Sequence, residues 1–214
     1  MIAGRVMPEA GVQRIDQESS LLPERMRAML ARQRGVQISA LGNVELLRQP
    51  LTGFFCSLRC PGMPIIKTFD LANELMKRGV PVIGGFHSAI EKECLRILLR
   101  GRQPIIICPA RSIERMRIPQ EWKTPLEEDR LLVISPFKDK HNRITKELSL
   151  QRNEFVATLA SEIIIAHAAP AGSTMTLAQQ LLYQGRRVWT LADESNEPLI
   201  ALGARPIEEG FWRE

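Results

Sequence analysis

From residue 51 onward, short apolar runs alternate with amphipathic segments along the chain. The runs are rich in Ile, Val, Leu and Phe without strict alternation, a pattern that is typical of strands buried on both faces of a sheet. They span residues 51–57, 80–86, 104–108, 131–137, 162–168 and 187–192. We therefore predict a mostly parallel sheet of about six or more strands.

The segments between these runs have the spacing of amphipathic helices that end at glycine. Segment 66–79 places its apolar side chains largely on one helical face, and Gly79 is positioned to end the helix. Gly101 and Gly185 close the helical segments 89–100 and 174–184 in the same way. The repeated order of helix, glycine and strand predicts an α/β protein with a Rossmann-like, three-layer fold.

The first 40 residues do not continue the alternation of strand-like and helix-like segments seen in the rest of the chain. Positions 1–20 lack clear periodicity, whereas 22–34 predicts a basic helix with a proline in its first turn. We therefore expect an N-terminal arm with a helix over 1–40, followed by one Rossmann-like domain over 41–214. Within that domain, 41–47 is expected to form a short helical piece, and 196–207 to pack back on the sheet.

Composition narrows the class of protein. No stretch approaches the roughly 20 apolar residues of a membrane helix, and the first residues lack the apolar core of a signal peptide. The four cysteines, at 56, 60, 94 and 108, form no dense disulfide framework, so we expect a cytoplasmic protein without membrane association. A net charge of +5 mildly favours anionic partners such as nucleic acids or nucleotides.

Three loops at the expected carboxyl ends of strands are candidates for a ligand site, because ligands of open parallel sheets bind there. They are residues 56–62, 84–88 and 170–174, which contain glycines and small hydroxyl side chains. Such loops let backbone N–H groups approach a phosphate, and Ser88 is placed to cap the next helix. No G-x-G-x-x-G or P-loop motif is present.

The sequence gives little support for a metal site, a redox site or a catalytic triad. Cys56 and Cys60 suggest a metal or redox site, but no second ligand pair has suitable spacing, so we expect no metal and no cofactor. The three histidines, at 87, 141 and 167, are too scattered to indicate a catalytic triad. His87 lies in a candidate ligand loop, where a hydrogen-bonded structural role is favoured over a catalytic one.

Five motifs in unbroken order resemble the central domain of the DprA/Smf family of DNA-processing proteins. Cys56-Ser-Leu-Arg59 lies where the family has Gly-Ser-Arg, and residues 84–91 resemble its Ser-Gly-x-Ala-x-Gly-Ile-Asp segment. Residues 151–160 are similar to its Arg-Arg-Asn-Arg stretch, and 172–176 fit its Gly-Ser-x-x-Thr. Residues 196–204 are similar to its Asn-x-Leu-Ile-x-x-Gly-Ala tail. The resemblance covers about 41–207.

This resemblance implies a homodimeric protein that binds single-stranded DNA and helps to load a recombinase, without catalysis. It implies a phosphate site formed by Ser57, Arg59, Gly84, Gly85, His87, Ser88, Arg152, Asn153, Gly172, Ser173 and Thr174. The basic stretch 138–143 reads as a solvated loop, but if DNA binds, Lys138, Lys140 and Arg143 are candidate backbone contacts.

The chain also departs from the family pattern. Cys56 replaces the family's loop glycine, Leu58 occupies its arginine position, and Glu91 replaces its aspartate. We expect neither the family's helical N-terminal domain nor its winged helix in a chain of this length. The alternative is a nucleotide-binding sensor or nucleotide-processing enzyme of the same fold group. Residues 108–112 lack the Pro-Gly-Gly-x-Gly-Thr loop of phosphoribohydrolases, whereas a sensor needs only the pocket.

Overall fold

The computed structural model describes residues 11–32, 36–138 and 140–208. In these ranges, nine strands form one sheet in the order β1-β2-β6-β5-β4-β3-β7-β8-β9. Both pairings of β2, with β1 and with β6, are antiparallel, and all the other pairings are parallel. The strands are β1 (Gln13–Ile15), β2 (Ile38–Gly42), β3 (Thr52–Cys56), β4 (Val82–Gly84), β5 (Ile105–Ile107), β6 (Leu131–Ser135), β7 (Glu162–His167), β8 (Val188–Leu191) and β9 (Arg205–Ile207).

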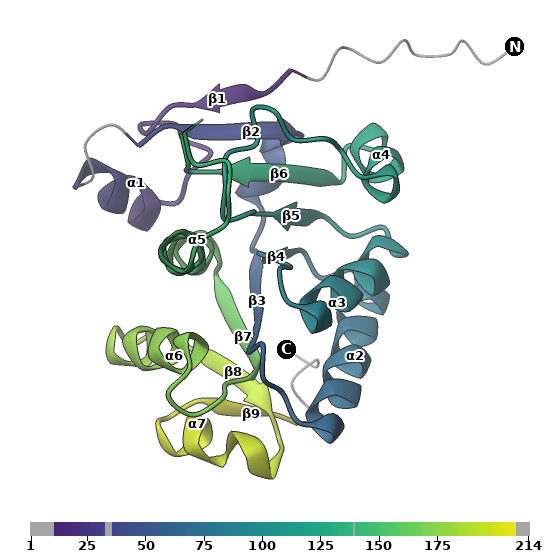
Figure 1. The fold of residues 1–214 in the computed structure, drawn as a ribbon, viewed down its shortest axis with the longest axis vertical. Helices are drawn as coiled ribbons and strands as arrows, with labels where there is room; N and C mark the ends of the chain where they lie inside the picture. The colour runs from purple at the N-terminus through teal and green to yellow at the C-terminus, as the bar shows by residue number, and fades with distance from the viewer. Residues whose placement is uncertain (1–10, 33–35, 139, 209–214) are drawn as a thin grey trace, which may run out of the picture.

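Helices cover both faces of the sheet (Figure 1). One face carries α2 (Gly62–Lys77), α3 (Ala89–Leu99) and α4 (Gln120–Glu127), and the other carries α1 (Glu24–Ala31), α5 (Lys146–Leu159) and α6 (Ser173–Tyr183). The short elements η1 (Val44–Arg48), η2 (Glu194–Asn196) and α7 (Glu197–Ala201) complete the described fold. Two large apolar clusters, one on each face, form the core. The predicted three-layer α/β fold is confirmed.

All six predicted apolar runs contain a strand, β3 to β8. Their side chains are buried almost throughout, because each of these strands has neighbours on both sides and helices above and below. The α/β pattern was therefore readable from hydrophobicity alone. No helix in the described ranges is long and apolar enough to cross a lipid bilayer.

The N-terminal part differs from the sequence-based expectation. Leu41 and Gly42 belong to β2, and only Val44–Arg48 forms a helical turn, so the short helix expected over 41–47 is partly wrong. The reason is tertiary, because Ile38–Gly42 is buried between β1 and β6, where ladder hydrogen bonds favour an extended chain. The expected division after residue 40 falls inside β2.

Glycine ends two of the predicted helices as expected. Gly79 and Gly185 adopt φ values of +68° and +70°, a left-handed conformation that favours glycine. Gly101 has another role, since a Cβ there would come within 2.1 Å of Gln103 Oε1. Helix α2 begins at Gly62, before the predicted start at 66, and the expected end of the first helix, at 34–35, lies outside the described residues.

The C-terminal segment packs on the sheet through Asn196. Its side chain is fully buried, and its Nδ2 donates to the carbonyl oxygens of Ala166 (2.8 Å) and Leu191 (3.2 Å). Its Oδ1 lies 2.9 Å from Nδ1 of the buried His167. Asn196 thus joins β7, β8 and α7, and His167 is a hydrogen-bonded core residue.

We expect Asn196→Ala to lower the free energy of unfolding by about 1–3 kcal/mol, because it leaves buried polar groups without partners. Urea unfolding followed by circular dichroism measures this change. Asn142→Ala is the control, since Asn142 is exposed, and its effect should stay within about 0.5 kcal/mol. Equal unfolding midpoints for the two variants would contradict this role of Asn196.

Candidate functional site

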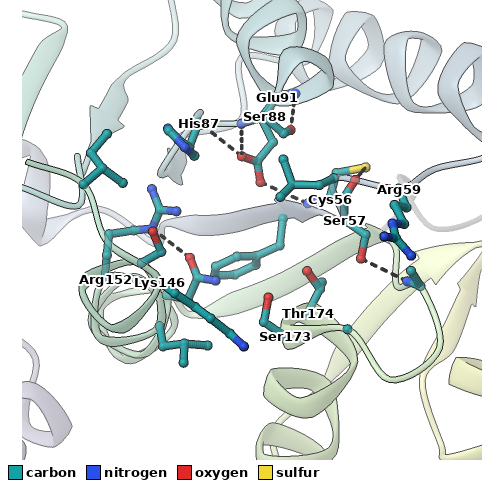
Figure 2. Close-up of a pocket in the computed structure, with 18 of the residues that line it drawn as sticks. Cys56, Ser57, Arg59, His87, Ser88, Glu91, Lys146, Arg152, Ser173 and Thr174 are labelled. Atoms are coloured by element: carbon teal, nitrogen blue, oxygen red, sulfur yellow. Dashed lines mark hydrogen bonds between the residues drawn. The ribbon is translucent and has the colours of Figure 1, made fainter.

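A pocket of about 770 Å³ lies at the carboxyl ends of β3, β4 and β7 (Figure 2). These strands are neighbours in the sheet, so their following loops meet at one edge. The first turns of α5 and α6 close the other side of the pocket. Because the three strands are parallel, their loops enclose a cavity at the sheet edge where proteins of this architecture bind ligands.

Most of the predicted site residues line this pocket. They are Ser57, Arg59, His87, Ser88, Arg152, Asn153, Gly172, Ser173 and Thr174. The structure adds residues around the start of α5 that the sequence reasoning missed, among them Ile144, Thr145, Lys146 and Ser149. They lie between nine and 14 residues after the end of β6, beyond the loops that directly follow the strands and carry the predicted site. One sequence feature could have indicated them: the basic residue Lys146 lies only a few positions before the segment 151–160 that resembles the family.

Gly84, the last residue of β4, and Gly85, which follows it, are not among the residues that line the pocket, and their expected contact with a ligand stays a prediction. A Cβ on Gly85 would lie 1.5 Å from Nη1 of Arg152, and a Cβ on Gly84 would lie 2.9 Å from the Phe86 ring. Gly85 therefore leaves room for the Arg152 guanidinium, and Gly84 leaves room for an aromatic ring of the core. Both glycines therefore act on the site indirectly, by leaving space for the side chains that pack against them.

Arg152 is the buried cation of the pocket, with only 5% of its surface exposed. Its Nε donates to Asn153 Oδ1 (2.7 Å) and its Nη1 donates to the carbonyl oxygen of Cys108 (3.2 Å). Among the described residues, no carboxylate forms an ion pair with it. An anionic ligand would stabilise a buried guanidinium that has no carboxylate partner.

The Glu91 carboxylate accepts from backbone N–H groups within two of the segments, 56–62 and 84–88, that were expected to approach a phosphate. Its Oε1 accepts from the N–H of Cys56 (3.1 Å), and its Oε2 accepts from those of His87 (2.9 Å) and Ser88 (3.2 Å). The hydroxyl of Ser88 accepts from the N–H of Glu91 (3.0 Å), which completes a capping box on α3 and confirms Ser88 as its cap. The carboxylate thus joins the β3 and β4 loops.

Ser57 joins the β3 loop to the β7 loop on the other side. Its N–H donates to the carbonyl oxygen of His167 and its hydroxyl accepts from the N–H of Ala169, each at 2.9 Å. Beyond this contact, α6 begins at Ser173 without a side-chain cap on its N-terminal amides. Within the part of the chain that the structure describes, no side chain caps the start of α6, which lines the pocket with its first N–H groups and the positive end of the helix dipole.

Two further cations surround the opening. Arg59 and Lys146 are exposed at its rim, and neither forms an ion pair with a described carboxylate. Partial burial, and after it the charges of Arg152 and Lys92, lower the pKa of His87 below its usual range. His87 is therefore neutral near pH 7. The pocket holds Arg59, Lys146 and Arg152 against one carboxylate, Glu91, which is already hydrogen-bonded.

The three basic residues expected as weaker contacts lie outside the pocket. Lys138, Lys140 and Arg143 are exposed on the loop from β6 to α5, which ends at the pocket-lining residue Ile144. Their positions beside the opening leave the expected contact with a ligand backbone as a prediction.

The thiols of Cys56 and Cys60 have pKa values that are shifted in opposite directions. A hydrogen bond from the Cys56 thiol lowers the pKa of Cys60, and the same contact, together with burial, raises the pKa of Cys56. Burial raises the pKa of Cys94 and Cys108 to about 12. Within the described residues, no cluster of three or more His, Cys, Asp or Glu side chains is placed to bind a metal ion.

We expect Cys60 to react first with iodoacetamide near pH 7.5, because its lowered pKa gives more thiolate and its side chain is partly exposed. Peptide mass spectrometry after brief labelling identifies the modified cysteine. Cys56→Ala should slow the labelling of Cys60 by removing the hydrogen-bond donor. Faster modification of Cys94 or Cys108 would refute the assignment.

Glu91→Gln should lower the free energy of unfolding by about 1–3 kcal/mol, because an amide NH₂ group would face backbone N–H donors. Glu93→Gln is the matched control on the same helix, since Glu93 pairs only with the exposed Arg96. Urea unfolding of both variants makes the comparison. Similar stabilities of the two variants would show that the contacts of Glu91 contribute little.

Comparison with known proteins identifies relatives of this chain. The family model described as "DNA recombination-mediator protein A" matches residues 14–210. None of the curated proteins compared with the chain matches significantly. Among solved structures, DNA processing protein A (DprA) from Streptococcus pneumoniae is similar with a TM-score of 0.72 and 17% identity, covering 92% of this chain and 71% of that one.

Two further structures share the fold. The DNA processing protein A from Helicobacter pylori, whose structure concerns a single-stranded DNA binding mode, gives a TM-score of 0.70 at 18% identity over 92% of this chain and 90% of that one. The molybdenum cofactor binding protein from Rippkaea orientalis gives 0.52 at 12% identity, covering 75% of this chain and 90% of that one. Because the family model spans nearly the whole described chain, this protein belongs to the DNA recombination-mediator protein A family.

Proposed function

We propose that this protein binds single-stranded DNA through its phosphate backbone, in recombination or DNA uptake, and that it does so without catalysis. The observation that carries the proposal is the buried Arg152, which has no carboxylate partner among the described residues and lies in the same pocket as Arg59 and Lys146. Family membership and the DNA-binding relative from Helicobacter pylori support it. A homodimer, a recombinase partner and a cytoplasmic location belong to the same proposal.

The geometry suits phosphate better than bases. A guanidinium fork and the uncapped start of α6 offer donors to phosphate oxygens, and they do not distinguish one base from another. The aromatic candidates for base stacking are in the core: Phe86 and Phe137 are 4% and 5% exposed, and Phe86 stacks on Phe54. Binding should therefore tolerate sequence changes and weaken with salt.

A nucleotide-binding sensor is the second candidate, and the pocket volume favours it. About 770 Å³ lies within the range of small-molecule sites, roughly 300–1,000 Å³. Titration with fluorescent oligothymidylates and with mononucleotides separates the two functions. Binding of mononucleotides alone would overturn the DNA proposal.

The double variant Arg59→Gln/Lys146→Gln should weaken oligothymidylate binding by about tenfold or more and reduce the slope of log Kd against log salt concentration by about 1.4, or 0.7 for each lost phosphate contact. Fluorescence anisotropy over a salt series measures both quantities. Arg100→Gln/Arg102→Gln removes the same charge at the opposite end of the sheet, where β5 begins, and should bind like the unmodified protein. Equal losses in the two variants would contradict a pocket-specific role.

Binding of a polyanion should raise the pKa of His87, because negative phosphates offset the charges of Arg152 and Lys92 that lower it in the free protein. NMR titration of the histidine ring protons with and without saturating oligothymidylate measures the change, and His87→Gln assigns the signal. An unchanged pKa in the bound state would place the phosphates away from the pocket.

A further inference from the structure

Two thiols are in contact at the end of β3. Cys56 is the last residue of that strand and lines the pocket, as Figure 2 shows, and Cys60 lies between β3 and α2. A hydrogen bond joins the two side chains, and Cys60 packs against the apolar cluster that contains Cys56. All four cysteines of the chain lie in the described ranges and have free thiols. Their spacing alone is weak evidence for a redox site, whereas the contact places a second thiol beside the first.

The two thiols differ in exposure and in acidity. Cys56 is only 5% exposed, whereas Cys60 is partly open to solvent. The hydrogen bond from Cys56 lowers the pKa of Cys60, against the opposing effects of burial and of the Asp193 carboxylate. The thiolate, rather than the thiol, is the nucleophile that attacks an oxidant. Cys60 therefore combines the access and the thiolate character of a cysteine that reacts first.

Cys56 is placed to react second. Its contact with Cys60 is the largest cause that raises its pKa, followed by burial. Oxidation of the Cys60 thiolate to a neutral sulfenic acid removes that negative charge, so the Cys56 thiol becomes easier to deprotonate when it must react. Cys94 is a poorer partner, because it is fully buried on α3, its pKa is raised by burial to about 12, and its thiol donates to the carbonyl oxygen of Thr68 (3.9 Å).

The segment between the two cysteines can move without disturbing the core. Leu58 is 78% exposed, Arg59 is also exposed, and a Cβ on Gly62 would have open space around it. The other end of the segment is fixed, because the N–H of Cys56 donates to the Glu91 carboxylate. A disulfide requires the sulfur atoms to be about 2 Å apart. The exposed residues can shift toward β3 to reach that distance.

We propose that Cys56 and Cys60 form a peroxide-reactive pair that closes to a reversible disulfide across the β3 loop. The Cys60 thiolate attacks one oxygen of hydrogen peroxide, the O–O bond breaks, and Cys60 sulfenic acid and hydroxide are formed. The Cys56 sulfur then attacks the Cys60 sulfur and the S–O bond breaks. The Cys56 proton leaves with the departing hydroxide as water. In total, two thiols are oxidised to one disulfide and one peroxide is reduced to two waters.

The disulfide closes a ring over residues 56–60, and Arg59 lies inside it. Oxidation therefore restricts the backbone that carries one of the cations at the rim of the pocket. Excess thiol reverses the bond by exchange, which makes the restriction temporary in a reducing environment. Disulfide formation needs no nucleic acid, so it is independent of the proposed function.

The test treats the reduced protein with a few equivalents of hydrogen peroxide near pH 7.5, and then blocks the remaining thiols with N-ethylmaleimide under denaturing conditions. Trypsin cleaves after Arg59, between the two cysteines, so mass spectrometry detects the disulfide as the linked peptides 49–59 and 60–67. Cys56→Ser and Cys60→Ser should each abolish the linked pair. Cys94→Ser is the matched control, which should retain it, and thermal unfolding verifies that each variant is folded.

We expect peroxide to reduce the number of blocked thiols in the unmodified protein from four to two, and dithiothreitol to restore all four. A linkage of Cys60 to Cys94 would overturn the proposal, as would oxidation of Cys60 to sulfinic acid without any disulfide, or no reaction at all. These outcomes are read from the unmodified protein, so they hold even if a variant does not fold. They also hold whether or not the protein binds oligothymidylate.

Hydrogen exchange followed by mass spectrometry tests the effect on the loop. Backbone amides of residues 57–60 should exchange more slowly in the oxidised protein than in the reduced protein, because the ring limits local opening. Peptides from α6, on the other face of the sheet, serve as the internal control and should exchange equally in both forms. Equal exchange at 57–60 in the two forms would show that the disulfide does not restrict the loop.

Discussion

Three backbone N–H groups, one at the end of β3 and two in the loop after β4, converge on the Glu91 carboxylate, and the wall of the pocket is built around this contact. The β3 and β4 loops follow adjacent parallel strands, so their amides would otherwise point into the cavity without partners. Glu91 satisfies them from the first turn of α3 and fixes the distance between the loops. Buried side-chain oxygens thus replace the ligand contacts that a glycine-rich loop usually provides.

Because Glu91 occupies these amides, most of the groups that can bind an anion lie on the opposite side of the pocket, at α5 and α6. With the β3 and β4 amides engaged, the donors that remain are the guanidinium of Arg152, the rim cations Arg59 and Lys146, and the start of α6. Gly85 is part of the same arrangement, because only a residue without a side chain leaves space for the Arg152 guanidinium. Glu91 and the loop glycines therefore have structural roles in the wall of the pocket.

The pocket follows from one topological fact. Parallel strands bring the loops that follow them to a single edge of the sheet, and here the neighbouring strands β3, β4 and β7 carry the pocket at that edge. Phe137, which follows β6, packs with Leu148 of α5, the helix whose first turns line the pocket.

Local sequence pattern indicates the six central strands, the three helices α2, α3 and α6, and the helix ends at Gly79 and Gly185, because burial on two faces and helix termination impose local patterns. The sequence also determined most of the pocket residues, through loops at strand ends and an ordered family resemblance. Only the tertiary structure decided that Ile38–Gly42 is a strand, since its neighbours β1 and β6 come from distant segments. Likewise, the engagement of Glu91, the space at Gly85 and the place of Lys146 depend on contacts between elements far apart in the chain, which no local pattern records.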